Sequence, residues 1–436
     1  MSSFDFSIQT LGPCTIPSPI HLSRQKGDFI SDYVSDSHRI AYQVDVDLRQ
    51  PAKTPDLLEV AGPRELIHFD PAKVKAAIVT CGGLCPGLND VVRSIVLCLW
   101  HRHGVRQILG IRYGYRGFLK EFGFDPIALT LEHVRDIHKQ GGTILGSSRG
   151  YGDRTTDIVD YLKKKGINQL FVIGGDGTQK GALAISDEIA RQGEEIAVVG
   201  IPKTIDNDLS FVQRSFGFET SVSIAVEVVY GAHTEAIGAH NGIGLVKLMG
   251  RESGFIAAQT TLACNDVNFV LIPEVPFSLG GDNGFLRHLK ARLMHRQHAV
   301  IVVAEGAGQD LMKENQHGSD ASGNKTLGDV GICLKNKISQ YFKEQRMEVG
   351  VKYIDPSYII RSAPANANDS VYCTRLGANA VHAAMCGRSG LIISLVHDKF
   401  VHVPIRLAVS ERNAIDAEGN LWRDVIEATG QPGNMF

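Results

Sequence analysis

The sequence predicts an α/β protein with two domains, each a sheet of buried, mostly parallel strands covered by helices. Apolar runs rich in Val, Ile and Leu recur from residue 74 onward, and helical stretches lie between most of them. Such continuous runs are typical of strands that are buried on both faces. Many of the runs end in glycine-rich or polar turns, which is where open α/β sheets bind ligands. With 436 residues, the chain is long enough for two or three domains.

Seven apolar runs are predicted to be strands, ending at Thr80, Gly175, Pro202, Gly250, Glu274, Gly306 and Val396. Their rhythm places one α/β unit around residues 74–217 and a second around residues 218–360. The expected domains are an N-terminal extension over residues 1–71, a first domain over 72–217 plus about 361–410, and a second over 218–360 plus about 411–436. Residues 309–329 are polar and are expected to form a surface loop.

The composition excludes several classes of function. A formal net charge of -2 gives no electrostatic reason to expect nucleic acid or an anionic membrane as a partner. No apolar run approaches the roughly 20 residues that span a bilayer, and the N-terminus lacks the pattern of a secretory signal. Cys81 and Cys85 flank a glycine pair, but no second Cys or His pair stands near enough to suggest zinc. We therefore expect a reduced, cytoplasmic enzyme.

The run VIGGDGTQKG, residues 172–181, has the order strand, glycine turn, helix. This order lets backbone N–H groups approach a phosphate. Asp176 within it is either a turn-forming residue or a ligand for Mg²⁺, and its place beside a phosphate-binding helix favours the metal. A second glycine turn, residues 80–96, either closes a βα unit or also binds phosphate. Arg149, in the Gly/Ser loop over residues 141–154, is either an exposed loop arginine or a contact to a polyphosphate.

The segment IPKTIDNDL, residues 201–209, places Lys203, Thr204, Asp206 and Asp208 just past an apolar strand. The two aspartates could form a simple helix N-cap pair, but the density of polar groups favours function. One carboxylate can take a proton from an attacking hydroxyl while others support a metal ion. Polar residues after two further strands, around Arg251 and at Glu305, extend the pattern. Together these segments predict a phosphoryl transferase.

With these residues in view, the chain resembles the 6-phosphofructokinases. GGxxPGxN at residues 82–89, GGDGT at 174–178, PKTIDND at 202–208 and MGRxSG at 249–254 occur in that family's order, and the match runs from about residue 74 to 384. GGDGT alone is weak, since NAD kinases and diacylglycerol kinases carry something close to it, but PKTIDND together with MGR is highly specific.

The resemblance implies two Rossmann-like three-layer domains with the active site between them. It also implies an allosteric, cytoplasmic enzyme of glycolysis that acts as a homo-oligomer, a dimer or a tetramer. With Mg²⁺, the enzyme would transfer the γ-phosphoryl group of ATP to the 1-hydroxyl of fructose 6-phosphate.

Carried over to this sequence, the resemblance also implies residue roles. The residues that would hold ATP are Gly83, Arg149, Gly150, Gly174, Gly175, Asp176, Gly177 and Thr178, with Asp176 binding Mg²⁺. The residues that would contact the sugar phosphate are Thr204, Ile205, Asp206, Met249, Gly250, Arg251, Glu305, Lys352, Tyr358 and Arg361. Asp206 would be the base on the 1-hydroxyl, and Asp208, Thr204 and Arg251 would complete the catalytic set.

Two departures from the best-known bacterial pattern bear on the phosphoryl donor. Lys203 replaces a glycine, a feature shared with pyrophosphate-using enzymes and with plant and trypanosomatid-type ATP enzymes. Gly177 stands where the pyrophosphate users place an aspartate, which would repel the α-phosphate region of ATP. This difference favours ATP as the donor.

Two further departures concern the 6-phosphate and an effector. Bacterial arginines that bind the 6-phosphate align with Gly242 and Lys352, so Lys352, Tyr358 and Arg361 are the candidates for that contact here. Arg93 matches a family arginine for an effector phosphate, or is an ordinary helix arginine.

The alternatives are a pyrophosphate-dependent phosphofructokinase, a catalytically silent regulatory subunit and an NAD kinase. Gly177 disfavours the first, and the presence of Asp206, Asp208 and Arg251 disfavours the second. PKTIDND and MGRESG together are not expected in an NAD kinase.

Overall fold

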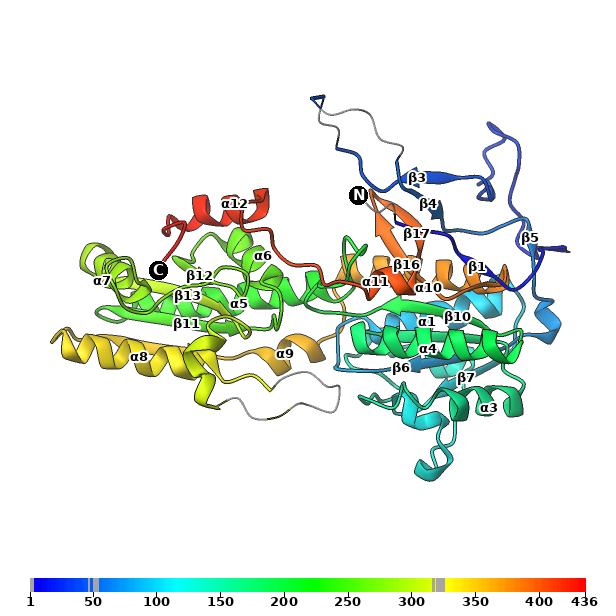
Figure 1. Ribbon diagram of the computed structural model, residues 1–436, viewed down its shortest axis with the longest axis horizontal. Coiled ribbons are helices and arrows are strands. Elements are labelled where there is room, and N and C mark those ends of the chain that lie inside the picture. The colour runs from blue at the N-terminus through cyan, green and yellow to red at the C-terminus, as the bar shows by residue number, and fades with distance from the viewer. Residues whose placement is uncertain (1–3, 46–47, 50–54, 316–317, 319–325) are drawn as a thin grey trace. The chain divides into compact units, whose positions relative to one another are not determined.

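A computed structural model describes residues 4–45, 48–49, 55–315, 318 and 326–436, which form two compact units (Figure 1). Unit 1 comprises the described residues up to Thr204, together with Leu209–Gly217 and Ala363–Arg412. Unit 2 comprises Ile205–Asp208, Phe218–Ser362 and Asn413–Phe436. The segment that carries the aspartates of TIDND is thus grouped with unit 2, and the N-terminal residues are grouped with unit 1.

Unit 1 is built on a nine-stranded sheet in the order β3-β4-β17-β16-β10-β9-β6-β7-β8. The bounds are β3 Arg39–Ala41, β4 Leu57–Val60, β17 Lys399–Pro404, β16 Leu391–Val396, β10 Ala197–Pro202, β9 Gln169–Gly174, β6 Lys75–Thr80, β7 Gln107–Ile111 and β8 Ile127–Ala128. The five strands from β16 to β7 are parallel, and the flanking pairs are antiparallel. β9 and β10 are buried along their whole length, as their continuous apolar sequences predict.

Helices cover both faces of this sheet. They are α1 Leu88–Leu97, α2 Leu131–Val134, α3 Thr155–Lys165, α4 Asp176–Gln192, α10 Ala367–Met385 and α11 Ile405–Ala408, and Cys98–Arg102 forms a π-helical turn, η2, after α1. Short 3₁₀ turns are η1 Pro71–Lys73, η3 Gly114–Phe118, η4 Lys120–Phe122 and η5 Ile137–Lys139. α3 and α4 share one apolar core with alternate residues of the central strands, while α1 and α10 pack together and α10 also contacts β10. The result is a three-layer arrangement.

Unit 2 contains a four-stranded parallel sheet in the order β12-β13-β11-β14. The strands are β11 Gly242–Leu248, β12 Phe269–Leu271, β13 His298–Ala304 and β14 Gly350–Ile354. The helices are α5 Phe218–Ile237, α6 Phe255–Cys264, α7 Phe285–Arg296, α8 Val330–Glu344, α9 Ser357–Ser362 and α12 Asn420–Thr429, with the 3₁₀ turn η6 at Gln309–Asn315. α7 and α8 share a core with the strands, and α5 and α6 also contact them.

The N-terminal segment adds strands to unit 1. β1 Gln9–Thr10 pairs with β15 Arg388–Ser389, and β2 Ile16–Pro17 pairs with β5 Leu66–Ile67. β4 pairs with β17 and so extends the nine-stranded sheet. No pattern in the sequence places these short strands within the first α/β unit, because their apolar runs are short and irregular.

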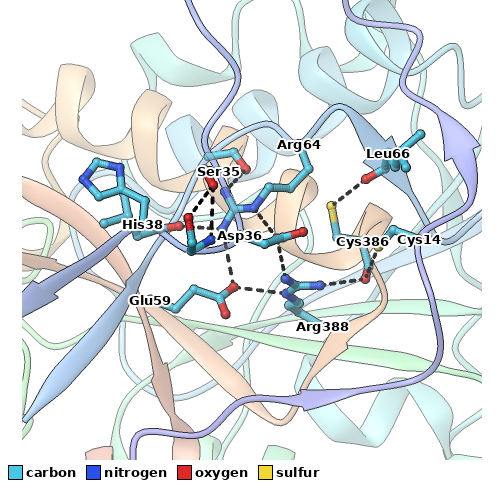
Figure 2. Close-up of polar contacts among 12 residues, drawn as sticks. Cys14, Ser35, Asp36, His38, Glu59, Arg64, Leu66, Cys386 and Arg388 are labelled. Carbon is cyan, nitrogen blue, oxygen red and sulfur yellow. Dashed lines mark hydrogen bonds and ion pairs between the residues drawn. The ribbon is translucent and has the colours of Figure 1, made fainter. Parts of the chain in front are cut away.

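A buried ion network anchors β4 (Figure 2). Glu59 accepts hydrogen bonds from Arg388 Nε at 3.0 Å and from His402 Nδ1 at 2.9 Å, and Arg64 Nη2 lies 3.4 Å away. Asp36 accepts hydrogen bonds from both arginines as well. Burial acts to raise the pKa of Glu59, but the hydrogen bond from His402 and the charge of Arg388 outweigh it and lower the pKa to about 2.

Each of the seven predicted apolar runs contains a strand. Residues 309–315 of the predicted loop form the turn η6, and most of its remaining residues up to 325 lie outside the described part of the chain. Among the described residues, no helix combines the length and the apolar character needed to cross a membrane.

Candidate functional site

In unit 1, three turns meet at the carboxyl edge of the parallel sheet. The register pairs Thr80 with Ile173 and Pro202 with Gly174, so β6, β9 and β10 end at the same level. The turn after β6 carries Gly82 and Gly83, the turn after β9 carries GGDGT, and Lys203 follows β10. This edge is where ligands bind in open α/β sheets.

Lys203 connects the three turns. Its Nζ donates a hydrogen bond to the carbonyl of Gly83 at 2.7 Å, and its backbone N–H donates to the carbonyl of Gly174 at 3.0 Å. The lysine is only 7% exposed. A buried ammonium at this edge favours the presence of anionic groups nearby.

The glycines here differ in the room around them. A Cβ at Gly82, where φ is +85°, would lie 3.3 Å from Lys203 Nζ, and one at Gly174 would overlap the side chain of Thr178. At Gly177, apart from its chain neighbours and the nearby backbone of α4, none of the described atoms lies within 4 Å of an added Cβ. Gly82 and Gly174 are therefore required by close packing and backbone conformation, whereas Gly177 borders open space at the start of α4.

Asp176 is the first residue of α4. Its Oδ2 lies 3.0 Å from Lys180 Nζ and 3.8 Å from Arg412 Nη2, and its side chain is 17% exposed. A carboxylate at a helix N-terminus is favoured by the helix dipole, and carboxylate oxygen is the ligand that Mg²⁺ prefers. The residue thus fits a magnesium ligand in chemical type and in access.

The loop before α3 is tied to this edge through its backbone. Gly82 N–H donates to the carbonyl of Ser148 at 2.9 Å, and Ser147 Oγ donates to the carbonyl of Gly82 at 2.6 Å. Arg149 and Gly150 follow directly and are exposed, with φ of +81° at Gly150. The sequence candidates for nucleotide binding in unit 1 therefore belong to connected turns.

Two positioning residues were missed by sequence reasoning. The buried Gln179 amide donates to the carbonyls of Gly174 at 3.0 Å and Ile201 at 3.2 Å, which ties the ends of β9 and β10 to α4. The Tyr115 hydroxyl donates to the carbonyl of Thr178 at 2.7 Å. A glutamine three residues past GGD is the signal that could have revealed the first contact.

In unit 2, polar residues meet at the carboxyl edge of β11, β13 and β14. Met249, Gly250 and Arg251 follow β11, Glu305 follows β13, and α9 with Tyr358 and Arg361 comes after β14. Backbone bonds join the first two turns, because Glu305 N–H donates to Leu248 at 2.9 Å and Gly306 N–H donates to Gly250 at 3.0 Å.

Glu305 lies among cations in unit 2. Burial raises the pKa of Glu305, and the nearby charges of Arg251, Lys247 and Arg361 act against that rise. The guanidinium of Arg361 lies 4.6 Å from the centre of the exposed Tyr358 ring. Arg251 and Arg361 are therefore each close enough to Glu305 to act on its carboxyl group.

Lys247 in β11 was not anticipated. Its Nζ lies 3.0 Å from Asp329 and 2.9 Å from Asp355, and the side chain is 12% exposed. A lysine inside the otherwise apolar run GIGLVKL is the signal that could have pointed to it.

The segment PKTIDND runs from unit 1 into unit 2. Ser215 Oγ hydrogen-bonds to the carbonyl of Thr204 in unit 1. In unit 2, Ser253 Oγ of MGRxSG donates to the carbonyl of Asp206 at 2.9 Å, and Asn413 N–H donates to the carbonyl of Asp208 at 2.9 Å. The backbone that carries both aspartates is thus held on either side by defined contacts.

The pattern that defines the phosphofructokinase family matches residues 75–384. The chain belongs to the phosphofructokinase family. Membership makes the protein a kinase, as the strand-end motifs predict. The match covers parts of both units described above.

Curated relatives extend the likeness over nearly the whole chain. An ATP-dependent 6-phosphofructokinase of Borreliella burgdorferi is 53% identical over 99% of this chain and 98% of its own length. ATP-dependent 6-phosphofructokinase 1 of Arabidopsis thaliana is 49% identical, covering 86% of this chain and 79% of its own. An ATP-dependent 6-phosphofructokinase of Trypanosoma brucei brucei is 48% identical, covering 87% of this chain and 78% of its own. The predicted similarity to plant and trypanosomatid enzymes is confirmed.

A solved phosphofructokinase shows the same fold. The pyrophosphate-dependent phosphofructokinase from Marinobacter aquaeolei superposes with a TM-score of 0.67, at 21% identity, over 82% of this chain and 91% of its own. This likeness concerns the fold alone, and it confirms the prediction of a two-domain α/β architecture.

Three residues that the sequence singled out lie apart from these phosphofructokinase turns. Lys352 lies within β14, and its Nζ is 3.8 Å from Oε2 of Glu235. Gly242 starts β11, where an added Cβ would overlap the carbonyl of Ala236 in α5, so an arginine here would force α5 away from the sheet. Arg93 lies on α1, and its Nε donates to the carbonyl of Arg135 at 3.4 Å.

Proposed function

We propose that the protein transfers the γ-phosphoryl group of ATP to the 1-hydroxyl of fructose 6-phosphate. The observation that carries the proposal is the group of glycine turns that Lys203 connects at the sheet edge, with the TIDND segment directly after it. The chain that carries them shares 53% sequence identity with an ATP-dependent 6-phosphofructokinase. Phosphoryl transfer depends on positioning and charge neutralisation rather than on covalent chemistry, and these two features supply both.

The glycine edge of unit 1 is suited to the nucleotide. Backbone N–H groups at the start of α4 would bind phosphate oxygens, and Arg149 would add a charged contact. Asp176 would hold Mg²⁺, which supplies positive charge to the transferring phosphoryl group when bound. Lys203 would neutralise negative charge between the turns that it connects.

The polar edge of unit 2 is suited to the sugar phosphate. Asp206 would take the proton from the 1-hydroxyl as the new P–O bond forms, and Asp208 would support it. Arg251 would stabilise the charge on the transferring group. Glu305 would accept hydrogen bonds from sugar hydroxyls, and Arg361 with Tyr358 would contact the 6-phosphate.

ATP is the proposed donor because of Gly177. The open space beside this glycine leaves room for the α- and β-phosphates, and no added charge opposes them. We also propose that the enzyme works in the cytoplasm and that it forms a homo-oligomer, a dimer or a tetramer. Sedimentation of the full chain would measure the oligomeric state.

A donor comparison tests the proposed function. Purified protein would be given fructose 6-phosphate and Mg²⁺ with either ATP or pyrophosphate, and formation of fructose 1,6-bisphosphate would be followed by a coupled assay. ATP should support a kcat/KM at least about 100-fold above that of pyrophosphate, a difference of nearly 3 kcal/mol in transition-state binding. Activity with pyrophosphate alone would overturn the donor assignment, and no product with either donor would overturn the function.

A further inference from the structure

A cysteine and two histidines meet inside unit 1, at the carboxyl-terminal end of α1. Cys98 and His103 flank the π-helical turn η2, and His382 lies in the last turn of α10. One ligand atom from each of the three residues lies within 4.8 Å of the other two. His103 Nε2 and His382 Nδ1 are 3.2 Å apart, and Cys98 Sγ lies 3.9 Å from the carbonyl of Ala378, one turn before His382.

The backbone of η2 brings Cys98 and His103 close together. In a regular α-helix, residues five apart point in directions about 140° from each other, so Cys98 and His103 would diverge. In η2 the N–H of His103 instead bonds to the carbonyl of Cys98 at 3.3 Å. This wider turn brings both side chains to the same side, and such turns occur often at functional sites.

The packing of α10 on α1 supplies the third residue. Ser94 Oγ of α1 donates to the carbonyl of Thr374 in α10 at 2.6 Å, two turns before His382. The three side chains are therefore held by well-packed helices. Cys98 is 6% exposed and His103 is 2% exposed.

The two imidazoles are available as ligands. Each imidazole directs one ring nitrogen at the other, His103 through Nε2 and His382 through Nδ1. The other ring nitrogen of His103, Nδ1, has no hydrogen-bond partner among the described residues, so Nε2 is the atom that meets His382. Imidazole nitrogens and a thiol, grouped within reach of one another, are the ligand types of zinc sites.

We propose that Cys98, His103 and His382 bind one Zn²⁺ ion. Zinc–nitrogen bonds of about 2.0–2.1 Å at a tetrahedral centre place two nitrogens about 3.3 Å apart. The observed separation of 3.2 Å between the two imidazole nitrogens matches this edge. Zinc–sulfur bonds of about 2.3 Å at the same centre place sulfur and nitrogen about 3.5 Å apart. The ligand atoms now lie within 4.8 Å of one another, so the Cys98 sulfur would close by at most about 1.3 Å.

A neighbouring pocket supplies the fourth ligand and the entry path. The pocket has a volume of about 820 Å³, and its lining includes Cys98 and His382 together with Arg93, Arg102 and His138. Three protein ligands leave one coordination position, which a water molecule from this pocket fills. The binding step replaces the thiol proton of Cys98 by the Zn–S bond and releases one proton to solvent.

The site is distinct in kind from the magnesium ligand proposed at Asp176. Mg²⁺ requires oxygen ligands and binds nitrogen and sulfur poorly, whereas zinc and cobalt bind both well. A sulfur-specific signal therefore separates the two sites even in a protein that binds both metals.

Cobalt substitution of the full chain is the test. Metal-free protein would be titrated with Co²⁺, and the thiolate-to-cobalt absorption band would be followed, then displaced with Zn²⁺ to obtain the zinc affinity. One equivalent per chain should produce the band in the wild type. Cys98→Ser and His382→Gln should each weaken binding at least about 100-fold, because losing a direct ligand costs more than losing an outer-sphere partner.

Cys14→Ser is the matched control. Cys14 lies next to a second thiol, Cys386, and hydrogen-bonds to its carbonyl at 3.4 Å, so it represents the alternative sulfur site. The control should keep the cobalt band, and zinc should raise the melting temperature of the wild type and of Cys14→Ser but not of Cys98→Ser. Three results would each overturn the proposal: no band in the wild type, a band that survives in Cys98→Ser, or a band that is lost in Cys14→Ser. The titration of the wild type tests the proposal even if a variant fails to fold.

Discussion

Replacing Gly177 by aspartate should lower the use of ATP without harming the fold. Apart from its chain neighbours and the nearby backbone of α4, none of the described atoms lies within 4 Å of a Cβ built on this glycine, so the first atom of a new side chain meets open space. Gly177 is the second residue of α4, where a carboxylate interacts favourably with the helix dipole. Removing a helical glycine and adding this charge should together stabilise the helix by about 1 kcal/mol.

The loss with ATP follows from charge. A carboxylate about 5 Å from a phosphate oxygen, at an effective dielectric constant near 20, is repelled by about 3 kcal/mol per unit charge. This corresponds to a loss of about 100-fold in kcat/KM with ATP. Pyrophosphate is shorter, so the variant should use it with a smaller loss or with a gain.

The assay measures kcat/KM for both donors at one Mg²⁺ concentration, alongside the melting temperature. Gly177→Asn is the control, because it adds nearly the same volume without the charge, and it should lose far less activity with ATP than Gly177→Asp. An aspartate variant that uses ATP within about threefold of the wild type would refute the reasoning, and an equal loss in both variants would assign the effect to size instead of charge.

Three further predictions concern other residues. Asp206→Asn should cut kcat by about 10²–10⁴-fold with little change in KM, as steady-state kinetics would show, and retention of half the turnover would contradict its role as base. Arg361→Ala should raise the KM for fructose 6-phosphate at least about tenfold more than that for ATP, whereas the reverse pattern would place it at the nucleotide. Glu59→Gln should lower the free energy of unfolding in urea by about 3 kcal/mol, because it leaves Arg64 and Arg388 buried beside a neutral side chain. Since the pKa of Glu59 is about 2 in the folded state, the wild type should hold this stability above pH 4.5 and lose it as the pH falls toward 2. If the free energy of unfolding of the variant depended on pH in the same way as that of the wild type, the role of the network would be contradicted.

The central strands could be predicted because burial on both faces leaves continuous apolar runs. β6, β9, β10 and β13 all fall where such runs occur. β17 was missed because His402 interrupts its apolar pattern, and the histidine is explained only by Glu59 on the neighbouring strand. Pairings between segments so distant in sequence leave no local periodic signal.

The candidate site also has residues that the sequence predicts and residues that it does not. The glycine turns could be predicted because positive φ and close packing demand glycine at positions such as Gly82. Gln179 and Lys247 each contact two or more groups through one side chain, and a lone polar residue in a sequence does not reveal those partners. The cluster of Cys98, His103 and His382 was outside the reach of spacing rules, because it depends on a π-helical turn and on a residue 279 positions away.

The place of β17 in unit 1 has a consequence for the order in which the chain folds during synthesis. β17, at Lys399–Pro404, lies between β16 and β4, so the N-terminal strands β3 and β4 cannot join the sheet until that late segment leaves the ribosome. The sheet of unit 2 is complete once β14 has emerged at Ile354. Unit 2 can therefore assemble its sheet while β3 and β4 of the N-terminal segment are still unpaired with β17 and leave a strand edge exposed. Pairings over such long sequence separations form slowly, and exposed strand edges favour association with other chains. The nascent protein is thus most vulnerable to aggregation before its last 40 or so residues are made, a stage at which a chaperone would have most effect on yield.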